Sequence, residues 1–125
     1  MSIIMKIDHG RELTIHKVTG EVFCEEIITA LKHYWGDQPT KNLLWDCTRA
    51  NMNHLFYSEA RTIIDYDIPK TNKRSGGKTA LVGPKNLEFG MLRTLKALRE
   101  FQNPSYQIEV FRSLVEANQW LDEED

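Results

Sequence analysis

Asp46 and Thr48 are the first residues in the chain whose types and spacing could support chemistry. Asp46 lies near the end of an apolar run, 43–47, that is typical of a buried strand, so its carboxylate should reach the carboxyl edge of a sheet. There we expect it to anchor the following loop by hydrogen bonds or to contact a ligand. A catalytic carboxylate would need a second acid, a base or a metal, and the sequence places no acidic residue beside Asp46.

The segment 48–58 that follows is predicted to be a surface loop, yet it carries an apolar cluster. The cluster consists of Met52, Leu55, Phe56 and Tyr57. Three roles remain open for it, namely covering the domain's own core, lining a small apolar pocket, and contacting a second copy in a homodimer. At the end of the loop, Ser58 precedes a helical pattern and is predicted to be its N-cap.

Cysteines and histidines give no sign of a nucleophile or a metal site. Cys24 and Cys47 stand in apolar surroundings, so we expect buried thiols rather than a disulfide or a reactive thiolate. The four histidines are scattered without metal-ligand spacing and are expected at the surface: His9, His16, His33 and His54. The sequence therefore predicts no metal and no cofactor.

The segment 70–78 is basic, and its end forms a Gly-Lys-Thr sequence with the next residue, at 77–79. A phosphate-binding loop follows a strand and opens a helix, whereas this tripeptide enters a strand, so it is not a P-loop. We expect a solvated loop, with an acidic partner or a lipid headgroup as the alternative. Its basic residues are Lys70, Lys73, Arg74 and Lys78.

Hydrophobic periodicity orders the elements that must position these residues. Strands are predicted at 3–8, 11–18, 43–47, 79–83 and 106–112, and helices at 21–35, 58–68, 86–101 and from 113 onward. This order predicts one α/β domain over residues 1–125, with a single mixed, mostly parallel sheet of about five strands opened by a β-hairpin and about four helices. In the third helix, Gly90 is expected to permit close approach of another backbone.

Composition limits the classes of function. The chain has 125 residues, 41% hydrophobic and 27% charged, with a net charge of -2. This balance argues against binding to a nucleic-acid backbone, and no run approaches the ~20 apolar residues of a membrane span. We expect a cytoplasmic protein.

The order of elements, together with Leu-Trp-Asp at 44–46 and Ala-Leu-Val-Gly-Pro-Lys-Asn-Leu-Glu-Phe-Gly-Met at 80–91, resembles the STAS-like, or SpoIIAA-like, family over nearly the whole chain. These proteins are relatives of the anti-sigma-factor antagonists. The resemblance implies a non-enzymatic regulatory or protein-interaction module. Because the family is related to lipid-binding domains, a carrier or sensor of a small apolar or lipid-like ligand is the alternative.

In the antagonists, a serine near the start of the helix after the third strand is phosphorylated in an Asp-Ser-Ser-Gly context. That context is absent here, and Ser58, or less directly Thr48, would take the place of the switch residue. The expected interaction or ligand surface is the loop 48–58 beside the turn formed by Gly83, Pro84 and Asn86. A protein partner or a homodimer would meet this surface.

Overall fold

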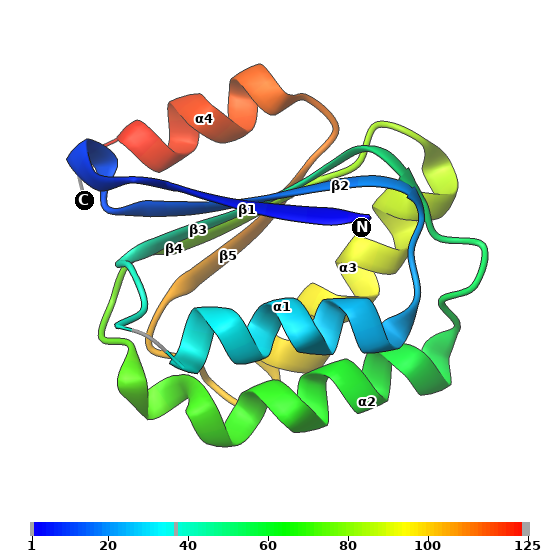
Figure 1. Ribbon diagram of the computed structural model, residues 1–125, viewed down its shortest axis with the longest axis horizontal. Helices are drawn as coiled ribbons and strands as arrows, with labels where there is room; N and C mark the ends of the chain where they lie inside the picture. Colours follow the sequence, from blue (N-terminus) through cyan, green and yellow to red (C-terminus); the bar gives the residue numbers. More distant parts are fainter. Residues whose placement is uncertain (1, 37, 124–125) are drawn as a thin grey trace.

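The computed structural model describes residues 2–36 and 38–123, apart from the side chains of residues 71 and 72. The strands are β1 (Ile3–Asp8), β2 (Leu13–Glu21), β3 (Asn42–Asn51), β4 (Lys78–Val82) and β5 (Gln107–Phe111). The α-helices are α1 (Cys24–Gly36), α2 (Tyr57–Asp67), α3 (Asn86–Glu100) and α4 (Leu114–Asp122), and short 3-10 helices span His9–Arg11 and Ile68–Lys73. Figure 1 shows this α/β arrangement, which confirms the predicted fold class.

The five strands form one mixed sheet in the order β1-β2-β3-β4-β5. β1 and β2 pair antiparallel, while β2, β3, β4 and β5 are parallel neighbours. The hairpin was predicted, and the central position of β3 agrees with the buried strand that its apolar run indicated. β3 is longer than predicted, because after a register shift it continues to pair with β2 as far as Asn51. Thr48 therefore lies in a strand, and the prediction that it begins the loop is wrong.

Helices cover both faces of the sheet. α1, α2 and α3 lie on one face, and α4 lies alone on the other (Figure 1). Alternate residues of β3 serve the two faces, since Leu43 and Trp45 join the larger core beneath the three helices and Leu44 joins the smaller core beneath α4. β4 and the first half of β3 are therefore buried on both faces, as expected of central parallel strands.

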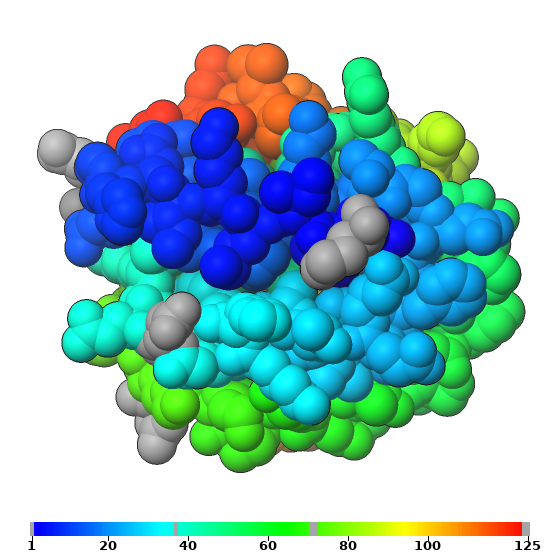
Figure 2. All heavy atoms as spheres, viewed as in Figure 1, coloured from blue at the N-terminus to red at the C-terminus, as the bar shows by residue number. Residues whose placement is uncertain are grey.

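One edge strand of the sheet is β1, which lies at the surface above α1 in the space-filling view (Figure 2). Ile4, Met5 and Ile7 of this strand are exposed. Among the described helices, none has both the length and the apolar character that crossing a membrane requires.

Two predicted helices differ from the structure at one end. α1 begins at Cys24, because the preceding residues complete the β2 ladder, and Phe23 is left outside the helix and exposed. At the end of α3, Phe101 was included in the predicted helix 86–101 but follows its last residue and is 84% exposed, and the buried residue of this turn is Arg99.

A glycine does bring α3 close to the sheet, but it is Gly83 and not the predicted Gly90. A Cβ atom placed on Gly83 would lie 3.0 Å from Leu92 Cδ1 and 3.2 Å from Glu88 Cβ, whereas one on Gly90 would meet open space. The missing side chain of Gly83 therefore lets the first turns of α3 pack against the end of β4.

Candidate ligand-binding cavity

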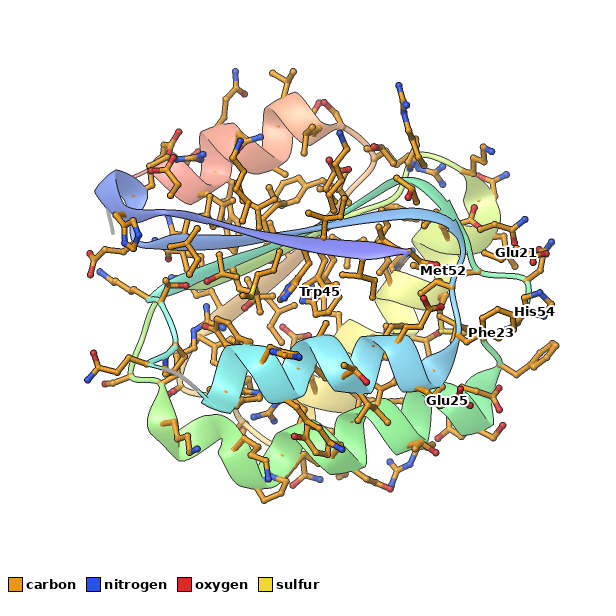
Figure 3. The ribbon with its side chains drawn as sticks, viewed as in Figure 1. Glu21, Phe23, Glu25, Trp45, Met52 and His54 are labelled. Atoms are coloured by element: carbon orange, nitrogen blue, oxygen red, sulfur yellow. The ribbon has the colours of Figure 1, made fainter. Side chains whose placement is uncertain are left out.

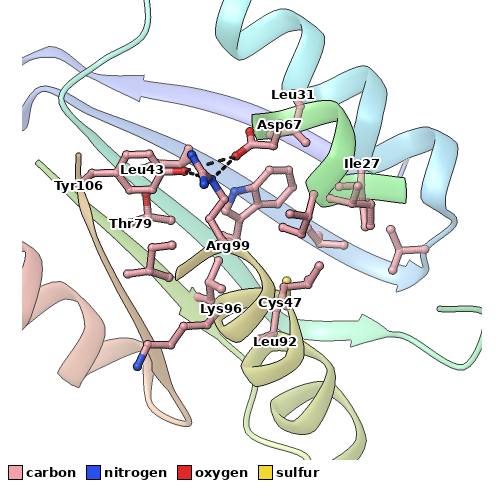
Figure 4. Close-up of a pocket in the computed structure, with 18 of the residues that line it drawn as sticks. Ile27, Leu31, Leu43, Cys47, Asp67, Thr79, Leu92, Lys96, Arg99 and Tyr106 are labelled. Atoms are coloured by element: carbon pink, nitrogen blue, oxygen red, sulfur yellow. Dashed lines mark hydrogen bonds and ion pairs between the residues drawn. The ribbon is translucent and has the colours of Figure 1, made fainter. Parts of the chain in front are cut away.

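A cavity of about 100 Å³ lies between the sheet and the helices α1, α2 and α3 (Figure 4). The sheet contributes Val18, Leu43, Trp45, Cys47, Leu81 and Ile108 to its wall, and the helices contribute Ile27, Leu31, Ile63, Leu92 and Leu95. Period-two alternation along the strands and the apolar stripes of the helices point these side chains at one another. The space is therefore bounded almost entirely by hydrocarbon.

One end of the cavity is polar, where the last turns of the three helices meet. Asp67 of α2 accepts a hydrogen bond from Trp35 Nε1 at 2.8 Å, and Arg99 Nε of α3 lies 3.2 Å from Asp67 Oδ2. The Tyr106 hydroxyl lies 3.3 Å from Asp67 Oδ2 and accepts from Arg99 Nε at 3.1 Å (Figure 4). Burial, reinforced by Asp67, raises the pKa of Tyr106 to about 12, so its hydroxyl keeps its proton at neutral pH.

Arg74 adds a second buried guanidinium to this end. It is 4% exposed and donates to Lys41 O, Thr79 Oγ1 and Lys78 O at 2.7–3.0 Å. Its Cζ lies 4.1 Å from the centroid of the Tyr106 ring. The predicted solvated loop is therefore wrong for Arg74, and also for Lys78, whose side chain is buried beneath α4.

Asp46 and Thr48 lie at the opposite, carboxyl edge of the sheet. Asp46 Oδ1 accepts hydrogen bonds from Thr48 N at 3.1 Å and from Thr48 Oγ1 at 2.7 Å. The carboxylate thus fixes Thr48 within β3. This is the anchoring that the sequence suggested, although the anchored residue belongs to the strand.

The predicted apolar cluster of the loop divides into two parts. Met52 and Leu55 are buried, and Met52 lines the cavity while its backbone N–H donates to Glu88 Oε2 of α3 at 3.0 Å. Phe56 and Tyr57 are instead exposed, at 65% and 61%. The first pair covers the core, and the second remains a candidate contact surface.

Figure 3 shows what lies beside Met52 at this edge. The rings of Phe23 and His54 stack with their centroids 4.5 Å apart, and His54 Nε2 lies 3.3 Å from Glu21 Oε1. These contacts join the end of β2 to the loop after β3. The same loop leads into Phe56 and Tyr57.

Ser58 is not the N-cap of α2. Phe56 holds that position, and the Glu59 side chain accepts a hydrogen bond from Phe56 N at 2.8 Å. The Ser58 hydroxyl instead donates to Glu59 Oε2 at 2.9 Å and is exposed. Ser58 is therefore accessible in the first turn, and the predicted capping role is wrong.

The turn after β4 is held by a neighbouring strand rather than left open to a ligand. Gly83 N donates to Phe111 O at 2.9 Å, and Arg112 Nη1 donates to both Pro84 O and Asn86 Oδ1 at 3.0 Å. Pro84 and Asn86 are exposed at the same edge of the sheet as the loop 48–58.

The two thiols are poor nucleophiles. Burial raises the pKa of Cys47, with Asp46 and Glu88 adding to the effect, and burial raises the pKa of Cys24 beside Glu59 and Glu25. Cys47 is buried as predicted, whereas Cys24 is partly exposed. One histidine departs from the surface prediction, since His16 is fully buried and its ring stacks on Trp45 at 4.1 Å.

The polar end of the cavity was not found from the sequence, although one signal pointed to it. Asp67 continues the buried face of Ile63 and Ile64, and Arg99 continues that of Leu92. A charged residue in phase with an apolar stripe indicates a buried ion. Its partner could not be named, because the two residues are 32 positions apart.

Comparison of the sequence with protein-family models and with curated proteins gave no match. The STAS-like resemblance therefore stays a prediction. Over residues 2–36 and 38–123, no three histidine, cysteine or acidic side chains come together as a metal site would require.

Proposed function

We propose that this protein is a non-enzymatic binding module, a carrier or sensor that holds a small, largely apolar molecule between its sheet and the helices α1, α2 and α3. The apolar cavity carries this proposal. Close-packed interiors contain few voids larger than a water molecule, so an apolar space of this size is a natural place for a hydrophobic guest.

The volume selects the size of guest. A cavity of about 150 Å³ lined by aliphatic and aromatic side chains binds benzene, whereas drug-sized ligands occupy about 300–1,000 Å³. The 100 Å³ available here suits a single ring or a short branched chain better than a long acyl chain. Met52 in the wall gives some adaptability, because its unbranched side chain repacks readily.

Fluorobenzene is a suitable probe of the cavity, with binding followed by ¹⁹F NMR. Cys47→Leu adds volume inside the cavity wall, so we expect it to weaken fluorobenzene binding at least tenfold. Cys24→Leu makes the same chemical change at a residue outside that wall and should leave binding within twofold of wild type. Equal affinities in all three proteins, or no binding to the wild type, would overturn the proposal.

Native mass spectrometry of freshly purified protein gives an independent test. A carrier or sensor that meets its ligand in the cell should show an additional small mass that is lost on denaturation. If no additional mass is found under gentle conditions and fluorobenzene also fails to bind, the protein is not a carrier.

A second candidate function is a regulatory protein-interaction module of the STAS-like type. The observation that favours it is the pair of adjacent exposed aromatics, Phe56 and Tyr57, at the start of α2. Exposed aromatic side chains supply much of the energy at protein interfaces. Ser58 follows them directly, so a phosphate there would change the charge of the same surface.

The double variant Phe56→Ser/Tyr57→Ser tests this second function. We expect it to remain folded and to lose a specific protein partner that the wild type retains in affinity capture. Phe101→Ser is the matched control, because Phe101 is even more exposed than Phe56 and Tyr57 but lies at the C-terminal end of α3. If both variants retain the same proteins as the wild type, the exposed aromatics are not the interaction surface.

A further inference from the structure

The polar end of the cavity holds more positive than negative charge. Arg74 and Arg99 are 4% and 3% exposed, and both line the cavity. Within residues 2–36 and 38–123, the structure sets one carboxylate, Asp67, against these two guanidinium groups. Two cations and one anion leave an excess of one positive charge in a site that water hardly reaches.

The third cation of the wall, Lys96, does not change this balance. Lys96 Nζ lies 3.6 Å from Glu109 and 3.9 Å from Glu100, so it has its own acidic partners at the rim. It is also more exposed than the two arginines. The excess charge therefore belongs to the Arg74, Arg99 and Asp67 group.

Arg99 also has an unused donor. Its Nε–H is shared by Asp67 and Tyr106, but its Nη1 is buried and has no hydrogen-bond partner among the residues that the structure describes. A buried donor on a charged group costs more free energy when unpaired than a neutral one, so such atoms are rarely left without an acceptor. A guanidinium is moreover suited to carboxylates by its planar arrangement of donors.

We propose that the molecule held in this cavity is a small monocarboxylate with an apolar body, whose carboxylate accepts a hydrogen bond from Arg99. This rests on the proposed binding function and names the chemical class of its ligand. A single negative charge balances the excess, while the body of the molecule packs against the hydrocarbon wall near Trp45 and Leu92. A dianion such as a phosphate monoester would overcompensate the charge.

The test compares two probes of similar shape, 4-fluorobenzoate and fluorobenzene, on the full chain by ¹⁹F NMR. We expect 4-fluorobenzoate to bind at least tenfold more tightly to the wild type. Arg99→Gln should abolish this preference while retaining fluorobenzene affinity within threefold. Lys96→Met, which removes the cation at the rim of the cavity, should keep the preference.

The outcomes separate the two proposals. If neither probe binds, the cavity is not a ligand site and the proposed function fails. If fluorobenzene binds as tightly as 4-fluorobenzoate, the function stands and the carboxylate inference is overturned. A preference for 4-fluorobenzoate that is lost in Lys96→Met but kept in Arg99→Gln would also overturn the inference. The carboxylate would then be bound by Lys96 at the rim of the cavity and not by Arg99.

A measurement on the wild type covers the case in which Arg99→Gln does not fold. The ¹⁵N–¹H resonance of the Arg99 side chain should shift on addition of 4-fluorobenzoate and remain in place with fluorobenzene. An Arg99 resonance unmoved at saturating 4-fluorobenzoate would contradict the contact.

Discussion

At the scale of single residues, burial governs the ionisation of His16. Its ring contacts those of Trp45 and Tyr34, and neither ring nitrogen has a hydrogen-bond partner within the described part of the chain. Burial lowers the pKa of His16 from 6.5 to about 4. The residue is therefore a neutral aromatic member of the core at physiological pH, and its protonation opposes folding.

This gives a prediction for stability in acid. In the unfolded chain His16 binds a proton near pH 6.5, whereas the folded protein resists protonation until about pH 4. The unfolded state therefore holds more protons between these values, and the free energy of unfolding should fall by about 3 kcal/mol as the pH drops across that window. Urea titrations at a series of pH values measure this loss.

The control is His16→Phe, which keeps an aromatic ring against Trp45 and cannot be protonated. Its free energy of unfolding should lose about 3 kcal/mol less than wild type over the same pH interval. Parallel curves for the two proteins would show that the acid sensitivity arises elsewhere.

Sequence patterns placed apolar residues more reliably than buried polar ones. Leu43, Leu44 and Trp45 are buried as their run predicted, because apolar side chains gain free energy wherever they leave water. Arg74 and His16 were expected at the surface and are buried. Their burial depends on acceptors or rings supplied by distant segments, which local sequence does not reveal.

At the scale of elements, hydrogen bonds at the helix starts distinguish two serines that look alike in sequence. Ser113 is the N-cap of α4, where its hydroxyl accepts a hydrogen bond from Glu116 N at 3.3 Å. Ser58 was predicted to do the same for α2 but lies inside the first turn. The start of α2 is fixed by Glu59 and by the burial of Leu55 just before it.

Alanine substitutions should therefore affect the two serines differently. Ser113→Ala removes an acceptor for a helix N–H and should lower the free energy of unfolding by about 1 kcal/mol. Ser58→Ala removes an exposed hydroxyl and should change it by less than about 0.5 kcal/mol. Chemical denaturation of both variants measures the difference, and equal losses would contradict the assignment of the caps.

Strand ends were harder to predict than strand centres. β2 and β3 both continue beyond their apolar runs, because Gly20 and Glu21 pair with Ala50 and Asn51. Neither segment has an alternating pattern that would indicate a strand by itself. The extension results from pairing between segments that lie 30 residues apart in sequence. Because of it, Thr48 lies in a strand and not in the predicted loop.

At the scale of the whole molecule, the two hydrophobic cores share the same strands. Trp35 and Trp45 lie in the larger core, while Trp120 of α4 packs against the smaller one. Adjacent residues of β3 pack into opposite cores, so the strand cannot leave one core and remain packed in the other. The cores should therefore unfold together.

The three tryptophans allow this cooperativity to be tested in the wild-type sequence. With 5-fluorotryptophan incorporated, each should give its own ¹⁹F resonance, assigned by single tryptophan-to-phenylalanine variants. We expect the native resonances of Trp35, Trp45 and Trp120 to disappear with one common urea midpoint, because a small single domain unfolds in an all-or-none transition. Loss of the native Trp120 resonance at a distinctly lower urea concentration would instead mean that α4 detaches from the sheet first. The sheet would then remain folded without the smaller core, and the two cores would not unfold together.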